Sequence, residues 1–143
     1  MASIKRFKTL LAFILILGSF AARPAEAAYQ RIVSLYTGHT DNIVALGAAA
    51  KLVGVSKNDR GEAVAKLPHL AMNAGPEEIL ALKPDLVLTR GLADRENPNL
   101  KSTLERAGVK VIVIDPPEWD GFGGYIKGLA PLVGADPGKA AAK

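Results

Sequence analysis

The sequence contains no cysteine, so a domain made from it has no disulfide and must rely on its apolar core for stability. The same absence excludes the cysteine-linked lipid anchor of a bacterial lipoprotein. Histidine is scarce, and the two present, His39 and His69, belong to no three- or four-ligand spacing. We therefore predict no metal site and no resident cofactor.

Recognisable catalytic motifs are also missing. No serine, histidine and acid fall into a nucleophile motif, and no paired carboxylates suggest general acid and base catalysis. Residues 121–124 are rich in glycine, but their spacing fits neither a dinucleotide-binding motif nor a P-loop. These absences favour a binding protein over an enzyme.

Residues 1–27 have the pattern of a secretory signal peptide. Basic residues precede an apolar run over residues 10–20, and Ala25, Glu26 and Ala27 form a cleavage site with a small residue at each end. A membrane anchor is the alternative, but the run has about 11 residues where about 20 are needed to span a bilayer. We expect cleavage, export to the periplasm of a bacterium with two membranes, and no stable membrane insertion afterwards.

The basic character of the whole chain, 18 Lys+Arg against 14 Asp+Glu, comes mostly from this leader. Without it, residues 28–143 carry 14 basic against 13 acidic side chains. A nearly neutral domain gives no reason to expect a nucleic-acid partner. Its length is enough for one domain of ordinary size.

Apolar runs of strand length alternate with helical segments in the rest of the chain. The clearest case is the stretch 74–90, in which Pro76 suits a first helical turn, Pro84 ends the helix, and an apolar strand follows. Strands are predicted at 31–35, 52–56, 70–72, 85–89 and 110–115, and helices are predicted to begin at Thr40, Pro76, Pro98 and Trp119. This alternation predicts an α/β fold with a doubly wound, mostly parallel sheet.

Ligands of such sheets bind beyond the carboxyl ends of the strands. The loops expected at that edge span residues 36–39, 57–61, 72–75, 90–97 and 115–121. We therefore expect a binding site built from these loops.

Several segments, in the order RIVSLYTGHTDNIVALGAAAKLVGVS, PEEILALKPDLVL, ERAG and VKVIVID, resemble the N-terminal lobe of the periplasmic substrate-binding proteins that serve iron-siderophore and vitamin B12 ABC importers. The resemblance extends over residues 31–136. It implies one lobe, residues 28–143, of a two-lobed fold whose second lobe is absent from the sequence. It further implies binding of a metal chelate, such as a ferric siderophore, haem or cobalamin, and delivery of that chelate to an inner-membrane ABC permease.

Asp41 falls where members of this family usually carry a glutamate, and the resemblance implies that this acid meets an arginine of the permease. A short exposed carboxylate can form such a charge-assisted pair and fix the orientation of docking. The alternative is a first-turn acid, next to Thr40 as N-cap, that favours the helix dipole.

Six side chains on the expected loops are predicted to contact the ligand: Tyr36, His39, Met72, Asn73, Arg90 and Trp119. Tyr36 and His39 offer a phenol and an imidazole for haem iron or for hydrogen bonds to a chelate. Arg90 suits an anionic ligand. Met72 offers an adaptable apolar surface where many relatives carry an aromatic ring, which weakens the case for a flat aromatic ligand.

Four of these residues also have an ordinary interpretation. Tyr36 and His39 can be polar loop residues, Arg90 a solvated arginine at a strand end, and Trp119 a ring that covers the core under the last helix. The whole chain has alternatives too. An exported α/β enzyme or nucleotide-binding domain would need a phosphate-binding loop after the first strand, and residues 36–39 contain no such motif. The third interpretation is an interaction module that lost ligand binding together with its second lobe.

Overall fold

The computed structural model describes residues 27–140, which form one five-stranded sheet with the order β3-β2-β1-β4-β5. Every neighbouring pair of strands in it is parallel. The strands are β1 (Ile32–Ser34), β2 (Leu52–Ser56), β3 (His69–Leu70), β4 (Leu86–Thr89) and β5 (Lys110–Val113). The predicted doubly wound α/β architecture is confirmed, whereas the signal peptide predicted in the leader lies, up to residue 26, outside the described residues.

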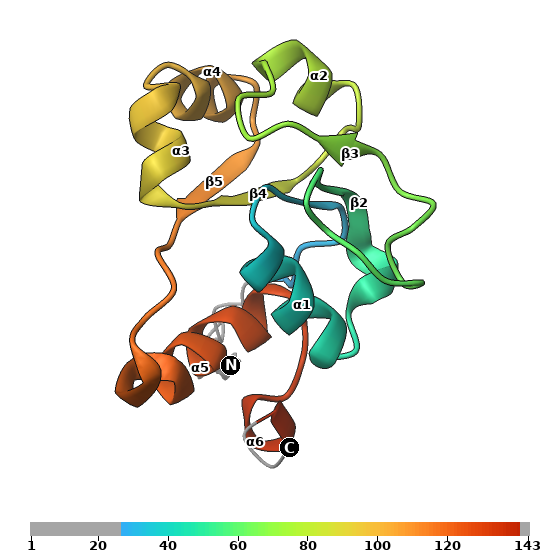
Figure 1. Cartoon of the computed structure of the whole chain (residues 1–143), viewed down its shortest axis with the longest axis vertical. Coiled ribbons are helices and arrows are strands. Elements are labelled where there is room, and N and C mark those ends of the chain that lie inside the picture. The colour runs from blue at the N-terminus through green and yellow to red at the C-terminus, as the bar shows by residue number, and fades with distance from the viewer. Residues whose placement is uncertain (1–26, 141–143) are drawn as a thin grey trace, which may run out of the picture.

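Helices cover both faces of the sheet. Figure 1 shows α1 and α5 on one side and α2 and α4 on the other. The helices are α1 (Thr37–Ala45), α2 (Pro76–Leu80), α3 (Gly91–Glu96), α4 (Leu100–Arg106), α5 (Phe122–Leu132) and α6 (Pro137–Ala140), with short 3-10 turns η1 (Ala49–Lys51) and η2 (Trp119–Gly121). Within residues 27–140, none of these helices has the length and apolar character needed to cross a bilayer.

The two faces of the sheet have separate cores because successive side chains of a strand point in opposite directions. Ile32 of β1 packs in the cluster that contains Ile43 of α1 and Leu129 of α5. Val33, the next residue, packs in the cluster that contains Ile79 of α2 and Leu104 of α4. A strand buried on both faces explains the nearly continuous apolar runs seen in the sequence.

The elbow between α2 and β4 forms as the prolines predict. Pro76 occupies the first turn of α2 with Glu77 beside it, and Lys83, just before Pro84, has a φ of 51° that ends any helical path. Asp85 then accepts hydrogen bonds from the backbone amide of Arg31 at 2.9 Å. The acid therefore ties the start of β4 to the start of β1.

Several predicted boundaries are wrong, and two of them change where candidate site residues lie. Helix α1 begins at Thr37 rather than after Thr40, because the Tyr36 carbonyl already accepts the amides of His39 and Thr40 at 3.0 and 3.1 Å. The predicted loop over residues 90–97 contains α3, whose first amide, from Gly91, donates to the Asp115 carboxylate at 3.0 Å. This stabilising acid comes from beyond β5, so no local pattern could indicate it.

Candidate functional site

Tyr36 and Arg90 meet at the carboxyl edge of the sheet. Each follows one of two adjacent parallel strands, β1 and β4, so both leave the sheet on the same side. The guanidinium carbon of Arg90 lies 4.7 Å from the centre of the Tyr36 ring, which is a cation–π contact. The predicted proximity of these two residues is confirmed.

Asp115 completes the surroundings of Arg90 from the other side. Its Oδ1 lies 3.6 Å from Arg90 Nε and accepts the Gly91 amide. Gly91 permits this approach, since a Cβ there would lie 2.7 Å from Asp115 Oδ2. Arg90 is thus held between a ring and a carboxylate, with its side chain 34% exposed. The sequence did not single out Asp115, although it is the acid that closes the apolar run of β5.

His39 is buried inside the molecule, with 1% of its surface exposed. Its Nε2 donates to the Ile114 carbonyl at 3.0 Å, which leaves Nδ1 to accept the Tyr125 hydroxyl at 2.6 Å. Burial lowers the pKa of His39 and raises the pKa of Tyr125 to about 12. The expectation of a loop histidine is wrong: His39 lies on α1 and both of its ring nitrogens are engaged within the fold.

A row of aromatic rings leads from Tyr36 and His39 to the surface. Consecutive ring centres are 5.2 Å apart for Tyr36 and His39, and 5.8 Å for His39 and Tyr125. The row continues through Phe122, 6.0 Å from Tyr125, to Trp119, 6.3 Å from Phe122. Trp119 is 92% exposed, so the alternative that it covers the core is wrong. Phe122 and Tyr125 were not predicted as site residues, because their position depends on where α5 packs.

Met72 and Asn73 lie on the far side of the sheet from Trp119. Both follow β3, and β2 separates β3 from β1. Because neighbouring strands are about 4.8 Å apart, β3 is roughly 10 Å from β1 and 19 Å from β5. Figure 1 shows β3 and the start of α5 on opposite sides of the molecule. The sequence predicted that Met72 and Asn73 share one site with Tyr36 and Arg90. The structure instead separates them from these two residues.

Asp41 is exposed on α1, one turn past the first helical residue. The first turn of α1 contains no acid, so the interpretation of Asp41 as a dipole-favouring first-turn acid is wrong. Its carboxylate faces solvent from α1, which suits contact with a partner.

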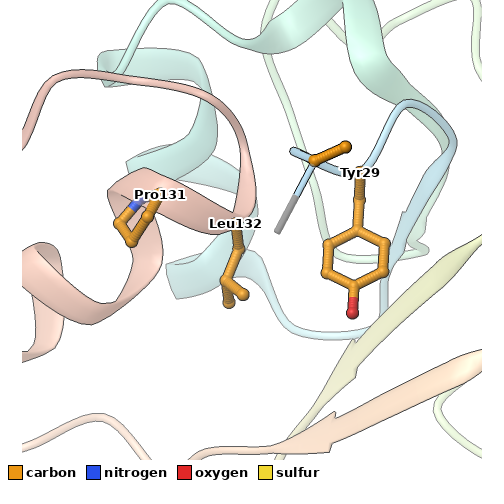
Figure 2. A pocket seen from close by; sticks show the side chains of 4 residues that line it. Tyr29, Pro131 and Leu132 are labelled. Atoms are coloured by element: carbon orange, nitrogen blue, oxygen red, sulfur yellow. The ribbon is translucent and has the colours of Figure 1, made fainter. Parts of the chain in front are cut away.

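A shallow pocket lies at the other edge of the sheet, where the strands begin. It has a volume of about 160 Å³ and is lined by Ala27, Tyr29, Pro131 and Leu132. Figure 2 shows Tyr29 and Leu132 on either side of it. None of the predicted ligand residues contributes to this lining. Among residues 27–140, no group of three or more histidine or acidic side chains is placed to hold a metal ion.

Comparison with known proteins finds relatives that are named as binding proteins. No family model matches the chain. The chain is 35% identical over 122 residues to a vitamin B12-binding protein of Yersinia pseudotuberculosis serotype O:1b (strain IP 31758). The matched region covers 83% of this chain and 42% of the relative. A solved periplasmic heme-binding protein from Pseudomonas aeruginosa superimposes with a TM-score of 0.71 at 30% identity, over 80% of this chain and 41% of that one. A periplasmic heme-binding protein from Roseiflexus sp. RS-1 gives 0.62 at 30% identity, over 78% and 43%.

The parallel sheet with its polar carboxyl edge defines one α/β lobe of the two-lobed periplasmic binding-protein fold. Within that class, the chain is similar to periplasmic proteins named for binding vitamin B12 and heme, in agreement with its sequence resemblance to the substrate-binding proteins of iron-siderophore and vitamin B12 ABC importers. It spans less than half the length of the relatives it matches.

Proposed function

We propose that this chain is the solute-binding lobe of an ABC importer. It captures a metal chelate, such as a ferric siderophore, haem or cobalamin, at the carboxyl edge of its sheet and delivers it to an inner-membrane permease. Capture depends on shape and charge, and no bond is made or broken. The relatives support this class of ligand, since they are named for binding vitamin B12 and heme.

The observation that carries the proposal is the position of Arg90. Its guanidinium lies between the Tyr36 ring and the Asp115 carboxylate, at the edge where parallel sheets bind ligands. A guanidinium fixed by stacking presents its donors in a defined plane, which suits a carboxylate, a catecholate or the phosphate of a corrinoid. The exposed face of Trp119 offers an apolar surface at the end of the same row of rings.

Delivery requires contact with the permease, and we assign this role to Asp41. Its exposed carboxylate stands on α1, the helix that follows the Tyr36 corner. A pair between this acid and an arginine of the permease fixes the orientation of docking. Export through the inner membrane to the periplasm follows from the predicted signal peptide and agrees with the periplasmic relatives.

The test is a binding titration of the purified protein with cyanocobalamin, haemin and a ferric catecholate. Trp119 is the single tryptophan of the chain and is exposed, so its fluorescence reports binding, and equilibrium dialysis excludes optical artefacts. We expect saturable binding of at least one chelate with a Kd of about 10 μM or tighter. Absence of saturable binding of all three at about 100 μM contradicts the proposal for this chain.

A second titration distinguishes a lobe that binds the chelate alone from a lobe that binds it only together with a second lobe. The same titration is made with this chain fused to the second lobe of the Pseudomonas heme-binding relative. If the fusion binds a chelate and this chain alone binds none, the chain is not a binding protein by itself. The interaction-module alternative then replaces the proposal.

A further inference from the structure

Three buried polar side chains lie directly beneath the Tyr36 corner. Ser34 ends β1, Thr40 belongs to α1, and Asp59 follows β2, and their exposed fractions are 0%, 1% and 1%. Thr40 Oγ1 lies 2.8 Å from Ser34 Oγ and 2.9 Å from Asp59 Oδ2. Asp59 Oδ2 also accepts the Ser56 amide at 2.7 Å. The cluster therefore connects two strand ends with the first helix.

The chemistry of the cluster fixes the direction of its hydrogen bonds. A carboxylate only accepts, so the single hydroxyl proton of Thr40 goes to Asp59 Oδ2. The Ser34 hydroxyl is then the donor in its own contacts, with Thr40 Oγ1 at 2.8 Å or with the Tyr36 carbonyl at 3.2 Å. Because the acceptor at the end is a carboxylate, the bond from Thr40 is of the stronger, charge-assisted kind.

The cluster meets the backbone of Tyr36 at its carbonyl. This carbonyl accepts the amides of His39 and Thr40, lies 3.4 Å from Thr40 Oγ1, and is the alternative acceptor, at 3.2 Å, for the single proton of the Ser34 hydroxyl. These contacts determine where α1 begins and how the chain turns from β1 at Tyr36. The direction of the chain at Tyr36 then places the Tyr36 ring under the Arg90 guanidinium.

The cost of the cluster argues that it does more than fill space. Asp59 Oδ1 is buried and has no hydrogen-bond partner among the described residues. A buried polar atom without a partner is unfavourable, and apolar side chains of similar volume are commonly as stable as a buried charged cluster. What a charged cluster provides instead is one defined arrangement of the segments that it joins.

We propose that Asp59, acting through Thr40 and Ser34, is a positioning residue that holds Tyr36 in register with Arg90, and that chelate binding depends on it. The dependence on the chelate rests on the proposed function, whereas the effect on Tyr36 does not. None of the three side chains needs to touch the ligand. Their role is to fix the ring that does.

The decisive variant is Thr40→Val, which keeps the shape of the side chain and removes its hydroxyl. Thr40→Ser restores the hydroxyl and should rescue. Thr89→Val is the matched control, since Thr89 is also buried at the end of a strand but its hydroxyl has no partner among the described residues. Ser34→Ala removes the hydroxyl at the other end of the cluster and serves as a second variant should Thr40→Val fail to fold.

The first measurement needs no ligand. A proton above an aromatic ring is shifted upfield, so the Arg90 Nε–H signal in a ¹H–¹⁵N spectrum reports the position of the Tyr36 ring. We expect this shift in the wild-type protein, Thr40→Ser and Thr89→Val, and its loss in Thr40→Val or Ser34→Ala. An unchanged shift in folded Thr40→Val and Ser34→Ala overturns the positioning role, whatever the protein binds.

The second measurement is the affinity for the chelate that the wild-type protein binds. We expect Thr40→Val to bind at least about tenfold more weakly than Thr89→Val, since one hydrogen bond to a charged group contributes a factor of at least about this size. Equal affinities overturn the claim that binding depends on the cluster. If the wild-type protein binds none of the three chelates, the proposed function fails, and the Arg90 signal still decides the positioning role.

Discussion

The guanidinium carbon of Arg90 lies 4.7 Å from the centre of the Tyr36 ring, across the ends of two adjacent parallel strands. These residues are far apart in the sequence, and the register of β1 against β4 is what brings them together. Asp115, beyond the next strand, holds the guanidinium from the other side. The carboxyl edge of the sheet thus combines a cation, a ring and an acid in one place.

Replacement of Arg90 by lysine tests the stacked geometry. Lysine keeps the charge but loses the planar group that rests on Tyr36 and faces an anion with two donors. We expect Arg90→Lys to weaken chelate binding by about fivefold, equivalent to about 1 kcal/mol, in the titrations described above. Arg106→Lys, on the exposed side of α4, is the matched control and should bind as the wild-type protein does. Equal affinities of the two variants would show that charge alone is sufficient.

Replacement of Asp41 tests docking separately from capture. We expect Asp41→Asn to leave chelate affinity unchanged and to change the free energy of unfolding by less than about 0.5 kcal/mol, because the side chain is exposed. The chelate-stimulated ATPase activity of the cognate reconstituted permease should fall severalfold. Glu105→Gln on α4 is the control for loss of one exposed acid. Full stimulation by Asp41→Asn would remove Asp41 from the docking surface.

His39 should make the stability of the protein depend on pH. Burial lowers its folded-state pKa below the ordinary 6.5, so below pH 6.5 the unfolded chain binds a proton that the folded protein resists. The stabilisation is therefore complete above pH 6.5 and declines as the pH falls towards the folded-state pKa, by at most about 1.4 kcal/mol per pH unit. Urea unfolding between pH 7.5 and 5 measures this decline.

A pair of variants separates His39 from the other groups that titrate in that range. The charged and titratable groups that face or contact the His39 imidazole are Arg90, Asp115, Tyr36 and Tyr125. These four residues are unchanged in both variants. His39→Gln should be less stable at pH 7.5 but should lose less stability on acidification. His69→Gln, which removes the exposed imidazole of β3, is the control for loss of one imidazole. Identical slopes in the wild-type protein and His39→Gln would mean that the pKa of His39 is not lowered in the folded state.

Substitution by alanine should change the free energy of unfolding in opposite directions at two glycines. Gly54 is buried in β2, and a Cβ there would lie 2.5 Å from Leu82 Cδ1 and 3.4 Å from Val33 Cγ2, so Gly54→Ala overpacks the sheet face and should destabilise by about 1–3 kcal/mol. Gly128 lies in α5 with open space at its Cβ position, and Gly128→Ala should stabilise by about 0.5–1 kcal/mol. Chemical unfolding measures both. Destabilisation by Gly128→Ala would mean that this face of α5 is covered.

Local sequence determined the elements whose signals are local. Pro76 and Pro84 mark the two ends of the segment that holds α2, and Gly108, with a φ of 87°, follows α4 as predicted. The apolar runs gave β2 and β4 almost residue for residue, because a strand covered on both faces must be apolar throughout. Alternation of these elements was then sufficient to predict the parallel sheet.

The tertiary structure alone decided what the site contains. Helix α3 depends on Asp115, and the burial of His39 depends on Tyr125 of α5, so neither could be inferred from neighbours in the chain. Strand order also separated Met72 and Asn73 from Arg90. A sequence specifies which residues end the strands, but which of those ends become neighbours depends on the order in which the strands pair, and that order is set by packing of the whole domain.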